Sequence, residues 1–391
     1  MKVQVDIAIV GAGVVGLAAA LMAAKRGLQV AIIEAHIPKV WKSDVPDLRV
    51  YALALDNQHF LTQLGVWSNI QAKRANPYSG MTVFDEVQGE PLQFNASELG
   101  QSCLGHIVEN DVIVDVLWQA LQLEKNVQFY CPDKIKNIHA NPNSVQLTLQ
   151  SGIEFDALLA IGADGARSKV RELICIESKT HDYQQKGLVA FVETQLPHQN
   201  TAWQRFLSTG PLAFLPFSDT VCSIVWTLPN ARADELLKVD AVTFCLALDS
   251  AFAGTLGKTR LISERAAFPL QRQLADTMLK DRTLLLGDAA HAVHPLAGQG
   301  VNLGLRDVAE LQKVFVSAQA KQLDPLELNG LHRWARQRFS DNAMAAYAFE
   351  NINRVFSNDN FALSLLRGPM LGLGNKIIPL KNAMARYAAG L

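Results

Sequence analysis

The chain has 391 residues, of which 49% are hydrophobic and 19% are charged, and its formal net charge is −1. This length exceeds that of one ordinary core and predicts two domains with an extension. The near-neutral charge argues against nucleic acid as a partner. Five isolated cysteines, with no Cys-x-x-Cys pair, suggest neither a zinc site nor a disulfide framework and fit a reducing cytoplasm.

The first element is an apolar run that breaks into Gly11, Gly13 and Gly16, with Glu34 at the end of a second apolar run. This spacing predicts a strand, a tight turn, a helix and a second strand over 1–36, as in dinucleotide-binding sites. Gly11 permits the turn, Gly13 lets the backbone approach a pyrophosphate, and Gly16 lets the helix pack on the strand. The helix N-terminus attracts phosphates, and Glu34 can accept hydrogen bonds from a ribose.

A rival interpretation of this segment is a membrane helix or signal peptide, because residues 7–24 contain no charge. Three glycines within six residues make a poor helix interior. Asp6 also precedes the run, where a signal peptide is neutral or basic. The nucleotide-binding interpretation is therefore favoured.

The next elements are short and mixed. Residues 37–50 are polar and predict a loop that ends in Asp47-Leu-Arg49, and 51–75 have the apolar spacing of a helix. The runs 81–84 and 91–94 predict a hairpin. A helix is expected over 110–123, with Asn110 as its N-cap. Further strands are expected at 127–130, 145–149 and 157–161.

The middle of the chain is rich in strand-like runs, which predict an antiparallel sheet over 188–193, 203–207, 213–217 and 221–227. A helix is expected at 241–252, a buried strand at 283–287, and helices from 300 onward. Nucleotide-type patterns thus occur at both ends of this sheet region. We expect a discontinuous α/β, Rossmann-like cofactor domain (1–76, 100–180, 265–330), an inserted antiparallel-sheet substrate domain (77–99, 181–264) and a C-terminal helical region (331–391).

Two later motifs place an aspartate after an apolar run. One is Asp164-Gly165-x-x-Ser168-x-x-Arg171. The other begins Gly287-Asp288-Ala-Ala-His291 and continues through Pro295 and Gly298-Gln299-Gly300 to Asn302. Its second half opens a helix that can point N–H groups at an anionic ring edge. Asp288 is placed for a ribitol or ribose hydroxyl, and Pro295 fixes the loop shape.

Other candidate residues have competing interpretations. Phe214 and Trp226 in the sheet region can line an aromatic-substrate pocket or belong to the core. Arg167, Lys169 and Arg171 can bind a phosphate or form a solvated helix start. His291 and His294 lack a third ligand at metal spacing, so no metal is expected.

Together the three glycine and aspartate motifs resemble the class A flavoprotein aromatic hydroxylases, which have the para-hydroxybenzoate-hydroxylase fold. Matches at Asp47-Leu-Arg49, Gly65-Val-Trp67, Val108-Glu-Asn110, Ala213-Phe-Leu-Pro216 and the C-terminal Ala-Arg-Tyr-Ala-Ala-Gly-Leu391 are most similar to the ubiquinone-biosynthesis hydroxylases. Among these, the 2-polyprenyl-3-methyl-6-methoxy-1,4-benzoquinol hydroxylase branch is most alike. The resemblance covers the whole chain.

The resemblance implies bound FAD and NAD(P)H as transient electron donor. It assigns FAD to Gly11, Gly13, Gly16, Glu34, Arg49, Asp164, Gly165, Asp288, Pro295, Gly298, Gly300, Val301 and Asn302. The pocket for the flavin ring and peroxide falls at Pro295, Gly298, Gln299 and Gly300. Glu109 occupies a position that is often Gln or Arg in relatives, which leaves its own contact open.

The implied reaction is ring hydroxylation of a polyprenylated benzoquinol by a flavin C4a-hydroperoxide formed with O2. The alternatives are a class A hydroxylase of another aromatic substrate and a non-catalytic flavoprotein scaffold of the ubiquinone-biosynthesis complex. Residues 331–391 carry eight Lys/Arg against three Asp/Glu. Such a basic tail suits either packing on its own protein or peripheral association with the inner face of the membrane or a biosynthetic complex. An oligomer is compatible with the sequence.

Overall fold

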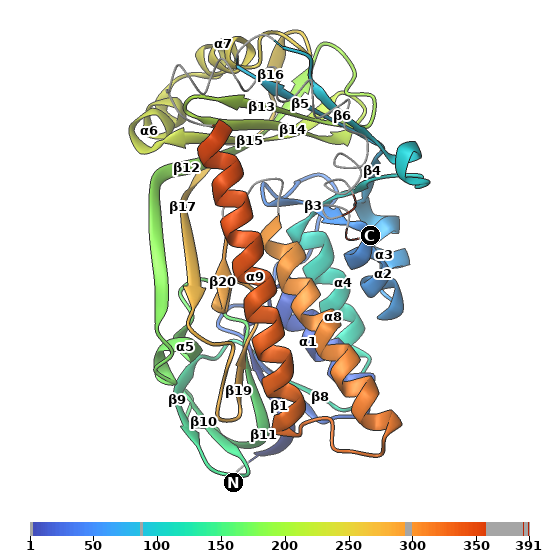
Figure 1. Cartoon of the computed structure of the whole chain (residues 1–391), viewed down its shortest axis with the longest axis vertical. Helices are drawn as coiled ribbons and strands as arrows, with labels where there is room; N and C mark the ends of the chain where they lie inside the picture. The colour runs from blue at the N-terminus through green and yellow to red at the C-terminus, as the bar shows by residue number, and fades with distance from the viewer. Residues whose placement is uncertain (1–2, 87–88, 294–298, 357–385, 387–389, 391) are drawn as a thin grey trace.

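The computed structural model of the protein describes residues 3–86, 89–293, 299–356, 386 and 390. Figure 1 shows an elongated molecule with one β-sheet toward the lower end, long helices beside it, and a second sheet across the upper end.

The lower sheet contains eight of the described strands in the order β18-β19-β11-β1-β2-β8, with β10 and β9 added beside β11. The pairs that join β19, β11, β1, β2 and β8 are parallel. The strands are β1 (Val3–Val10), β2 (Val30–Ile33), β8 (Val127–Tyr130), β9 (Ile135–Ala140), β10 (Val145–Leu149), β11 (Glu154–Gly162), β18 (Leu279–Lys280) and β19 (Thr283–Leu285).

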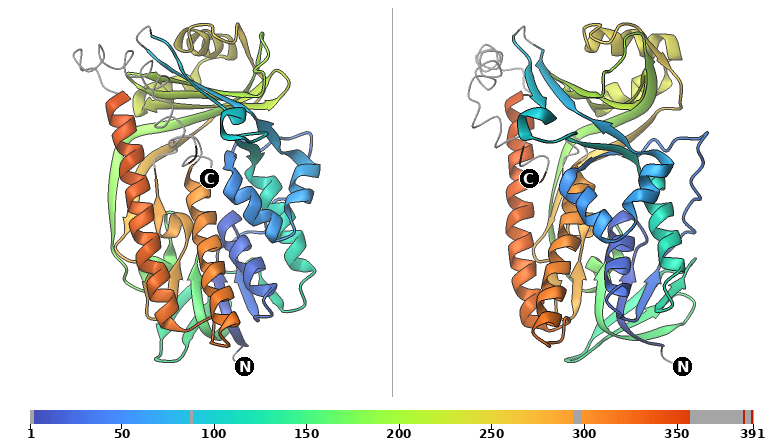
Figure 2. Two further views of the ribbon diagram at one scale, coloured as in Figure 1. Left: turned by 45° about the vertical axis from the view of Figure 1, so that its right-hand side comes forward. Right: turned by 90° about the vertical axis from the view of Figure 1, so that its right-hand side faces the viewer.

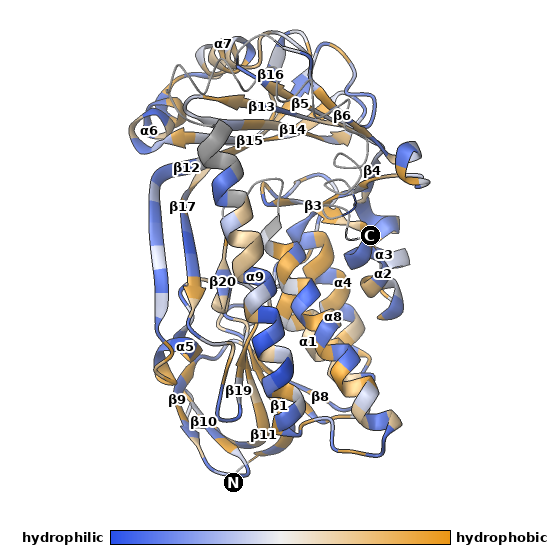
Figure 3. Cartoon of the chain, viewed as in Figure 1, coloured by the Kyte–Doolittle hydropathy of each residue, from blue (hydrophilic) through white to orange (hydrophobic). Residues whose placement is uncertain are grey.

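Helices cover this sheet because its central strands are apolar on both faces. Helix α1 (Val14–Ala24) is buried along nearly its whole length and contacts both α4 (Asn110–Gln122) and α8 (Gln299–Ala320). Figure 3 shows the hydrophobic residues of α1 and the neighbouring strands concentrated at the centre of the lower half. The final described helix is α9 (Leu328–Phe356), which runs beside α8 toward the upper sheet in Figure 1.

The upper sheet contains nine described strands in the order β20-β17-β12-β15-β14-β13-β5-β6, with β16 beside β12. Its strands are β5 (Gly80–Asp85), β6 (Leu92–Asn95), β12 (Ser178–Thr194), β13 (Thr201–Leu207), β14 (Gly210–Ser218), β15 (Val221–Pro229), β16 (Thr259–Leu261), β17 (Ala266–Ala275) and β20 (His291–Ala292). Helices α6 (Asn230–Lys238) and α7 (Ala241–Ala251) cover its outer face, as both views of Figure 2 show.

The remaining described elements are short. They are β3 (Val50–Ala54), β4 (Asn76–Tyr78), β7 (Gly105–Glu109), α2 (Leu55–Gln63), α3 (Trp67–Arg74) and α5 (Lys169–Leu173), with 3-10 turns η1 (Ala96–Leu99) and η2 (Gly287–Ala289). The three strands β3, β7 and β4 form a separate antiparallel sheet.

Most of the predicted strands are confirmed, including the β5–β6 hairpin and the antiparallel sheet. The single helix predicted over 51–75 is wrong, because its first residues form β3 and pair with β7. The predicted N-cap is also wrong. Glu109 precedes the first turn of α4, whereas the Asn110 side chain accepts a hydrogen bond from the Tyr51 hydroxyl at 3.1 Å.

The domain boundaries stay a prediction. Strand β17 lies within the segment 265–330 that the sequence gives to the cofactor domain, yet it pairs with β12 in the upper sheet. In the C-terminal region 331–391, α9 provides the described helix, and most of the predicted basic tail lies outside the described residues.

Candidate functional site

A cavity of about 1050 Å³ lies where the carboxyl ends of β1, β2 and β11 face the inner surface of the upper sheet. Open parallel sheets bind ligands at the carboxyl ends of their strands. Most of the predicted site residues that the structure describes line this cavity, namely Gly11, Gly13, Glu34, Arg49, Asp164, Gly165, Asp288, Gly300 and Val301.

The three N-terminal glycines have separate physical roles. Gly11 has φ +108°, and a Cβ there would lie 2.3 Å from the Ala163 carbonyl oxygen. A Cβ on Gly16 would lie 2.0 Å from the Gly11 carbonyl oxygen, so Gly16 permits close packing of α1 on the turn. Gly13 has no atom within 4 Å of its Cβ direction and lines the cavity instead. It precedes α1 without a side-chain cap, which leaves N–H groups of the first turn for an anion.

The Glu34 carboxylate is held at the end of β2 by two backbone donors. Ala12 N–H donates to Oε2 at 2.7 Å, and His36 N–H donates to Oε1 at 2.9 Å. A carboxylate accepts about four hydrogen bonds, so Glu34 keeps acceptor capacity toward the cavity that it lines.

The Asp164 carboxylate has local partners that the sequence did not predict. It accepts hydrogen bonds from Ser168 Oγ at 2.5 Å, Lys169 N at 2.7 Å and Val170 N at 3.1 Å. Its side chain therefore caps the start of α5, and the adjacent Gly165 turns the chain with φ +83°.

Arg171 has a structural role that differs from both interpretations offered for the nearby cations. Its guanidinium donates to the Ala289 and Ala166 carbonyl oxygens at 2.8 and 2.9 Å, which ties the second motif to the third. Arg167 and Lys169 line the cavity, and Lys169 also pairs with Glu172.

Asp288 lines the cavity, and its side chain is exposed there. Burial raises the pKa of its carboxyl, while His291 and Arg49 act in the opposite direction. Arg49 and Tyr51 line the cavity beside it, and burial also raises the pKa of the Tyr51 hydroxyl. The cavity is thus lined by both the Asp288 carboxylate and the Arg49 guanidinium, which come from distant parts of the sequence.

Glu109 acts on Arg49 through the loop that carries it. Its buried carboxylate accepts a hydrogen bond from Asp47 N–H at 3.0 Å and pairs with Arg74 at 3.1 Å. The Asp47 carboxylate in turn accepts from Arg49 N–H at 2.9 Å. Sequence reasoning identified the position but had no pattern from which to infer this support.

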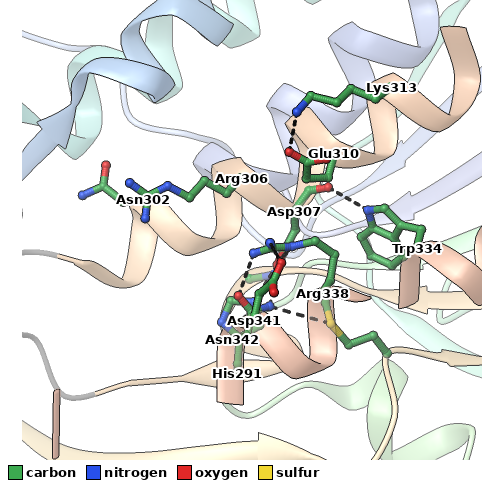
Figure 4. Close-up of polar contacts among 12 residues, drawn as sticks. His291, Asn302, Arg306, Asp307, Glu310, Lys313, Trp334, Arg338, Asp341 and Asn342 are labelled. Carbon is green, nitrogen blue, oxygen red and sulfur yellow. Dashed lines mark hydrogen bonds and ion pairs between the residues drawn. The ribbon is translucent and has the colours of Figure 1, made fainter. Parts of the chain in front are cut away.

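Behind the third motif, α8 and α9 meet in a buried polar network, which Figure 4 shows. The Asp307 carboxylate accepts from Arg338 Nε and Asn342 Nδ2, both at 2.9 Å, and from Gly287 N–H at 3.2 Å. Burial alone raises the pKa of Asp307, but His291, Arg338 and Asn342 together hold it below its ordinary value. Asp307 therefore fixes the turn that presents Asp288.

The predicted flavin-ring loop is described only in part. Pro295 and Gly298 lie outside the described residues, and the structure gives the backbone but no side-chain environment for Gln299, the first residue of α8. Gly300 and Val301 line the cavity. Asn302 is not among the lining residues. Its amide bonds the backbone of β3, accepting from Ala54 N–H at 2.9 Å and donating to the Ala52 oxygen at 2.8 Å.

The structure does not place Phe214 and Trp226 in the cavity. Both belong to the buried cluster between the upper sheet and α6 and α7, where the Phe214 ring contacts the Phe252 ring at a tilted angle. Side chains alternate between the faces of a strand, so the neighbouring residues face the cavity instead. The described residues of the upper sheet that line the cavity are Gly187, Val189, Gln204, Pro211, Ala213, Leu215, Val225, Thr227, Phe268, Pro269, Leu270, Gln271 and Ala292.

His291 pairs with Asp307 and does not face a set of metal ligands. Its predicted companion His294 lies outside the described residues. Among the residues that the structure describes, no group of three or more His, Cys, Asp or Glu side chains is arranged to hold a metal ion.

The site fits FAD. The glycine turn and uncapped helix start suit a pyrophosphate, and the Glu34 carboxylate at the end of β2 suits the adenosine ribose. Asp288 and Arg49 line the same cavity, and the resemblance implies that these two residues lie along the phosphates and ribitol.

Comparisons with known proteins agree with this fit. The chain matches the FAD binding domain family over residues 4–326. It is 35% identical to 3-demethoxyubiquinol 3-hydroxylase of Escherichia coli (strain K12), with 99% of this chain and 98% of that protein covered. It is 33% identical to ubiquinone hydroxylase UbiL of Rhodospirillum rubrum, with 98% and 89% covered.

A solved structure supports the fold. The p-nitrophenol 4-monooxygenase PnpA from Pseudomonas putida DLL-E4 is 15% identical, with a TM-score of 0.77, over 100% of this chain and 98% of that one. The chain therefore belongs to the FAD binding domain family, among the flavoprotein monooxygenases that include the ubiquinone-biosynthesis hydroxylases.

Proposed function

We propose that this protein hydroxylates the ring of a polyprenylated benzoquinol in ubiquinone biosynthesis, using FAD, O2 and NAD(P)H. The observation that carries the proposal is the single cavity described above, which joins the nucleotide cradle to an apolar sheet wall. The full-length similarity to two ubiquinone hydroxylases supports the substrate class.

In this proposal FAD supplies the oxygen activation that protein side chains lack. The backbone at Gly11 and Gly13 binds its pyrophosphate, Glu34 binds the adenosine ribose, and Asp288 with Arg49 binds the middle of the cofactor. NAD(P)H is a transient donor in this proposal. The segment at Asp164 and Gly165 lines the same cavity, which is consistent with a contact to either cofactor.

The upper sheet positions the substrate ring and keeps water away. Val189, Leu215 and Val225 present aliphatic surface to the cavity, and water exclusion protects a reactive oxygen species from side reactions. The lining residues of this wall include no ionisable side chain. The ring hydroxyls of a quinol therefore provide the electron density for the reaction without a protein base on that side.

A prenylated substrate partitions into a bilayer. We therefore propose that the protein is cytoplasmic and associates peripherally with the inner face of the membrane. None of the described helices is long and apolar enough to cross a bilayer. The basic residues of the C-terminal region attract anionic lipid headgroups. Flotation of the purified protein with vesicles, with and without anionic lipid, tests this part separately.

The activity test uses the purified protein with a short-chain prenylated benzoquinol. We expect a yellow protein whose flavin is released by acid precipitation, and NAD(P)H oxidation coupled to a product with one additional ring oxygen. A strain that lacks this gene should accumulate a quinol intermediate with one ring oxygen fewer.

Other outcomes separate the alternatives. Coupled hydroxylation of a soluble phenol, but of no prenylated quinol, would identify a class A hydroxylase of another substrate. Tight FAD binding without turnover of any aromatic compound would support the scaffold. Flavin that stays attached after acid precipitation would contradict non-covalent binding.

A further inference from the structure

The part of the sheet wall formed by β12, β13, β14 and β15 contains two uncharged polar side chains, Gln204 and Thr227, in an otherwise apolar surface. Across β12, β15, β14 and β13, successive paired residues form the row Val189, Val225, Ala213 and Gln204. Thr227 lies two residues from Val225 on β15, opposite Gly187. All of these residues line the cavity.

Gln204 and Thr227 are nearly inaccessible from outside, with exposed fractions of 7% and 2%. Their polar atoms are directed toward the inner face of the sheet, because the intervening residues Trp203 and Trp226 pack on the outer face. Neither side chain forms a hydrogen bond with another residue that the structure describes. Buried amides and hydroxyls are normally hydrogen-bonded, so a polar partner is expected within the cavity.

We propose that Gln204 and Thr227 bind oxygen substituents of the substrate ring and so select a neutral ring that carries oxygens on opposite sides. This inference rests on the proposed function and specifies its substrate class. An amide and a hydroxyl each both donate and accept hydrogen bonds, which matches quinol hydroxyls and methoxy oxygens alike.

The spacing of the two residues suits one ring. Gln204 lies on β13 and Thr227 on β15, with β14 between them. Two strand spacings, together with the offset of two residues along the strand, separate their backbones by roughly 12 Å. Both side chains extend from the sheet into the cavity. A single six-membered ring with oxygens at opposite positions can span the distance between their polar atoms through two hydrogen bonds of about 3 Å each.

The charge distribution excludes acidic aromatics from this wall. Among the described residues, the Lys and Arg side chains that line the cavity are Arg49, Lys134, Arg167 and Lys169, and none of them belongs to the upper sheet. A carboxylate placed against the apolar row would lack a cation partner, which is strongly unfavourable. A benzoate-type substrate is therefore disfavoured relative to a quinol.

The test combines ligand changes with conservative variants. The probe is a tail-less methoxy-methyl-benzoquinol, titrated anaerobically into the FAD-loaded protein while the flavin absorbance is followed. We expect Gln204→Leu and Thr227→Val each to raise Kd about tenfold, the effect of one lost hydrogen bond. Removal of one ring hydroxyl from the probe should weaken binding to the wild type by a similar factor.

A protein variant and a probe that lacks one ring hydroxyl can each remove the same hydrogen bond. In that case their effects on the binding free energy should not add. One of the variants should therefore bind the quinol and the corresponding deoxy probe with nearly equal Kd, an effect that a purely structural role does not produce. Steady-state assays should also show more NAD(P)H oxidised per hydroxylated product in the variants. A carboxylated analogue should bind the wild type more weakly than the quinol does.

The controls are Gln128→Leu on β8 and Thr148→Val on β10, the same chemical changes on strands of the lower sheet. They should leave Kd unchanged. If Gln204→Leu fails to fold, Gln204→Met removes the amide with an unbranched side chain, and the deoxy probe tests the wild type directly. Wild-type Kd in both cavity variants, with full FAD content, would overturn the inference. Failure of the wild type to bind or hydroxylate any quinol would instead overturn the proposed function.

Discussion

His291 Nε2 lies 2.5 Å from Asp307 Oδ2 in the interior of the protein, between the turn of the third motif and helix α8. The same carboxylate accepts from Arg338 on α9 and from the backbone of Gly287, the residue before Asp288. One buried aspartate thus connects the C-terminal helix to the turn that faces the cofactor cavity.

Replacement of Asp307 by Asn should destabilise the protein by about 3 kcal/mol, because it leaves the buried Arg338 guanidinium without its main counter-charge. Arg338 retains Asp341 at 3.0 Å, so the effect should not exceed this range. Thermal unfolding of the apoprotein measures the change, and FAD affinity should fall as the Gly287 turn loosens. Glu310→Gln, which breaks the surface pair with Lys313 on the same helix, should change stability by less than about 1 kcal/mol. Equal losses in the two variants would contradict the proposed importance of the buried network.

His106 should make the protein sensitive to mild acid. Burial lowers its pKa from 6.5 to about 4, and its ring packs edge-on against Trp67. The unfolded state therefore binds a proton between pH 6.5 and 4 that the folded state does not, so stability decreases as pH falls through this window. The loss attributable to this group is at most about 3 kcal/mol. Denaturant unfolding at several pH values should show a shallower decrease in His106→Gln, and identical pH profiles would rule out this role.

The first and third glycines of the N-terminal motif should behave differently from the second. Gly16→Ala places a Cβ 2.0 Å from the Gly11 carbonyl oxygen and should lower the melting temperature of the apoprotein. Gly13→Ala meets no atom within 4 Å, so it should preserve that temperature while weakening FAD binding, because the methyl group occupies the approach to the pyrophosphate. Flavin titration and thermal unfolding separate the two effects. Full FAD affinity in Gly13→Ala would show that the cofactor does not approach this backbone.

Asp288→Ala should weaken FAD binding ten- to hundredfold, as expected for the loss of a charge-assisted hydrogen bond of about 1.5–3 kcal/mol. The fold should remain intact because the side chain faces the cavity. Equilibrium titration of the apoprotein with FAD gives the affinity, and Asp276→Ala, an exposed carboxylate, serves as the matched control. An unchanged dissociation constant would remove Asp288 from the cofactor site.

The sequence alone determined the cofactor class. The positive φ of Gly11 and the packing of Gly16 on the Gly11 carbonyl involve residues close in the chain. A turn and a helix start were therefore recognisable from the glycine spacing. The strands of the upper sheet were also predictable, because alternating side chains and apolar runs are local properties. These patterns, with the later Asp164 and Asp288 motifs, were enough to indicate a flavoprotein hydroxylase.

The tertiary structure decided which side chains reach the cavity. The strand faces of Phe214 and Trp226 depend on where α6 and α7 pack, and those helices cover the face that the aromatics occupy. Asp164 caps α5 through contacts that spacing alone did not reveal. Asp307 pairs with Arg338 of another helix, and Glu109 holds the loop that carries Arg49, so both contacts join separate elements. Such contacts depend on how elements pack in three dimensions, and hydrophobic periodicity within one segment carries no information about them.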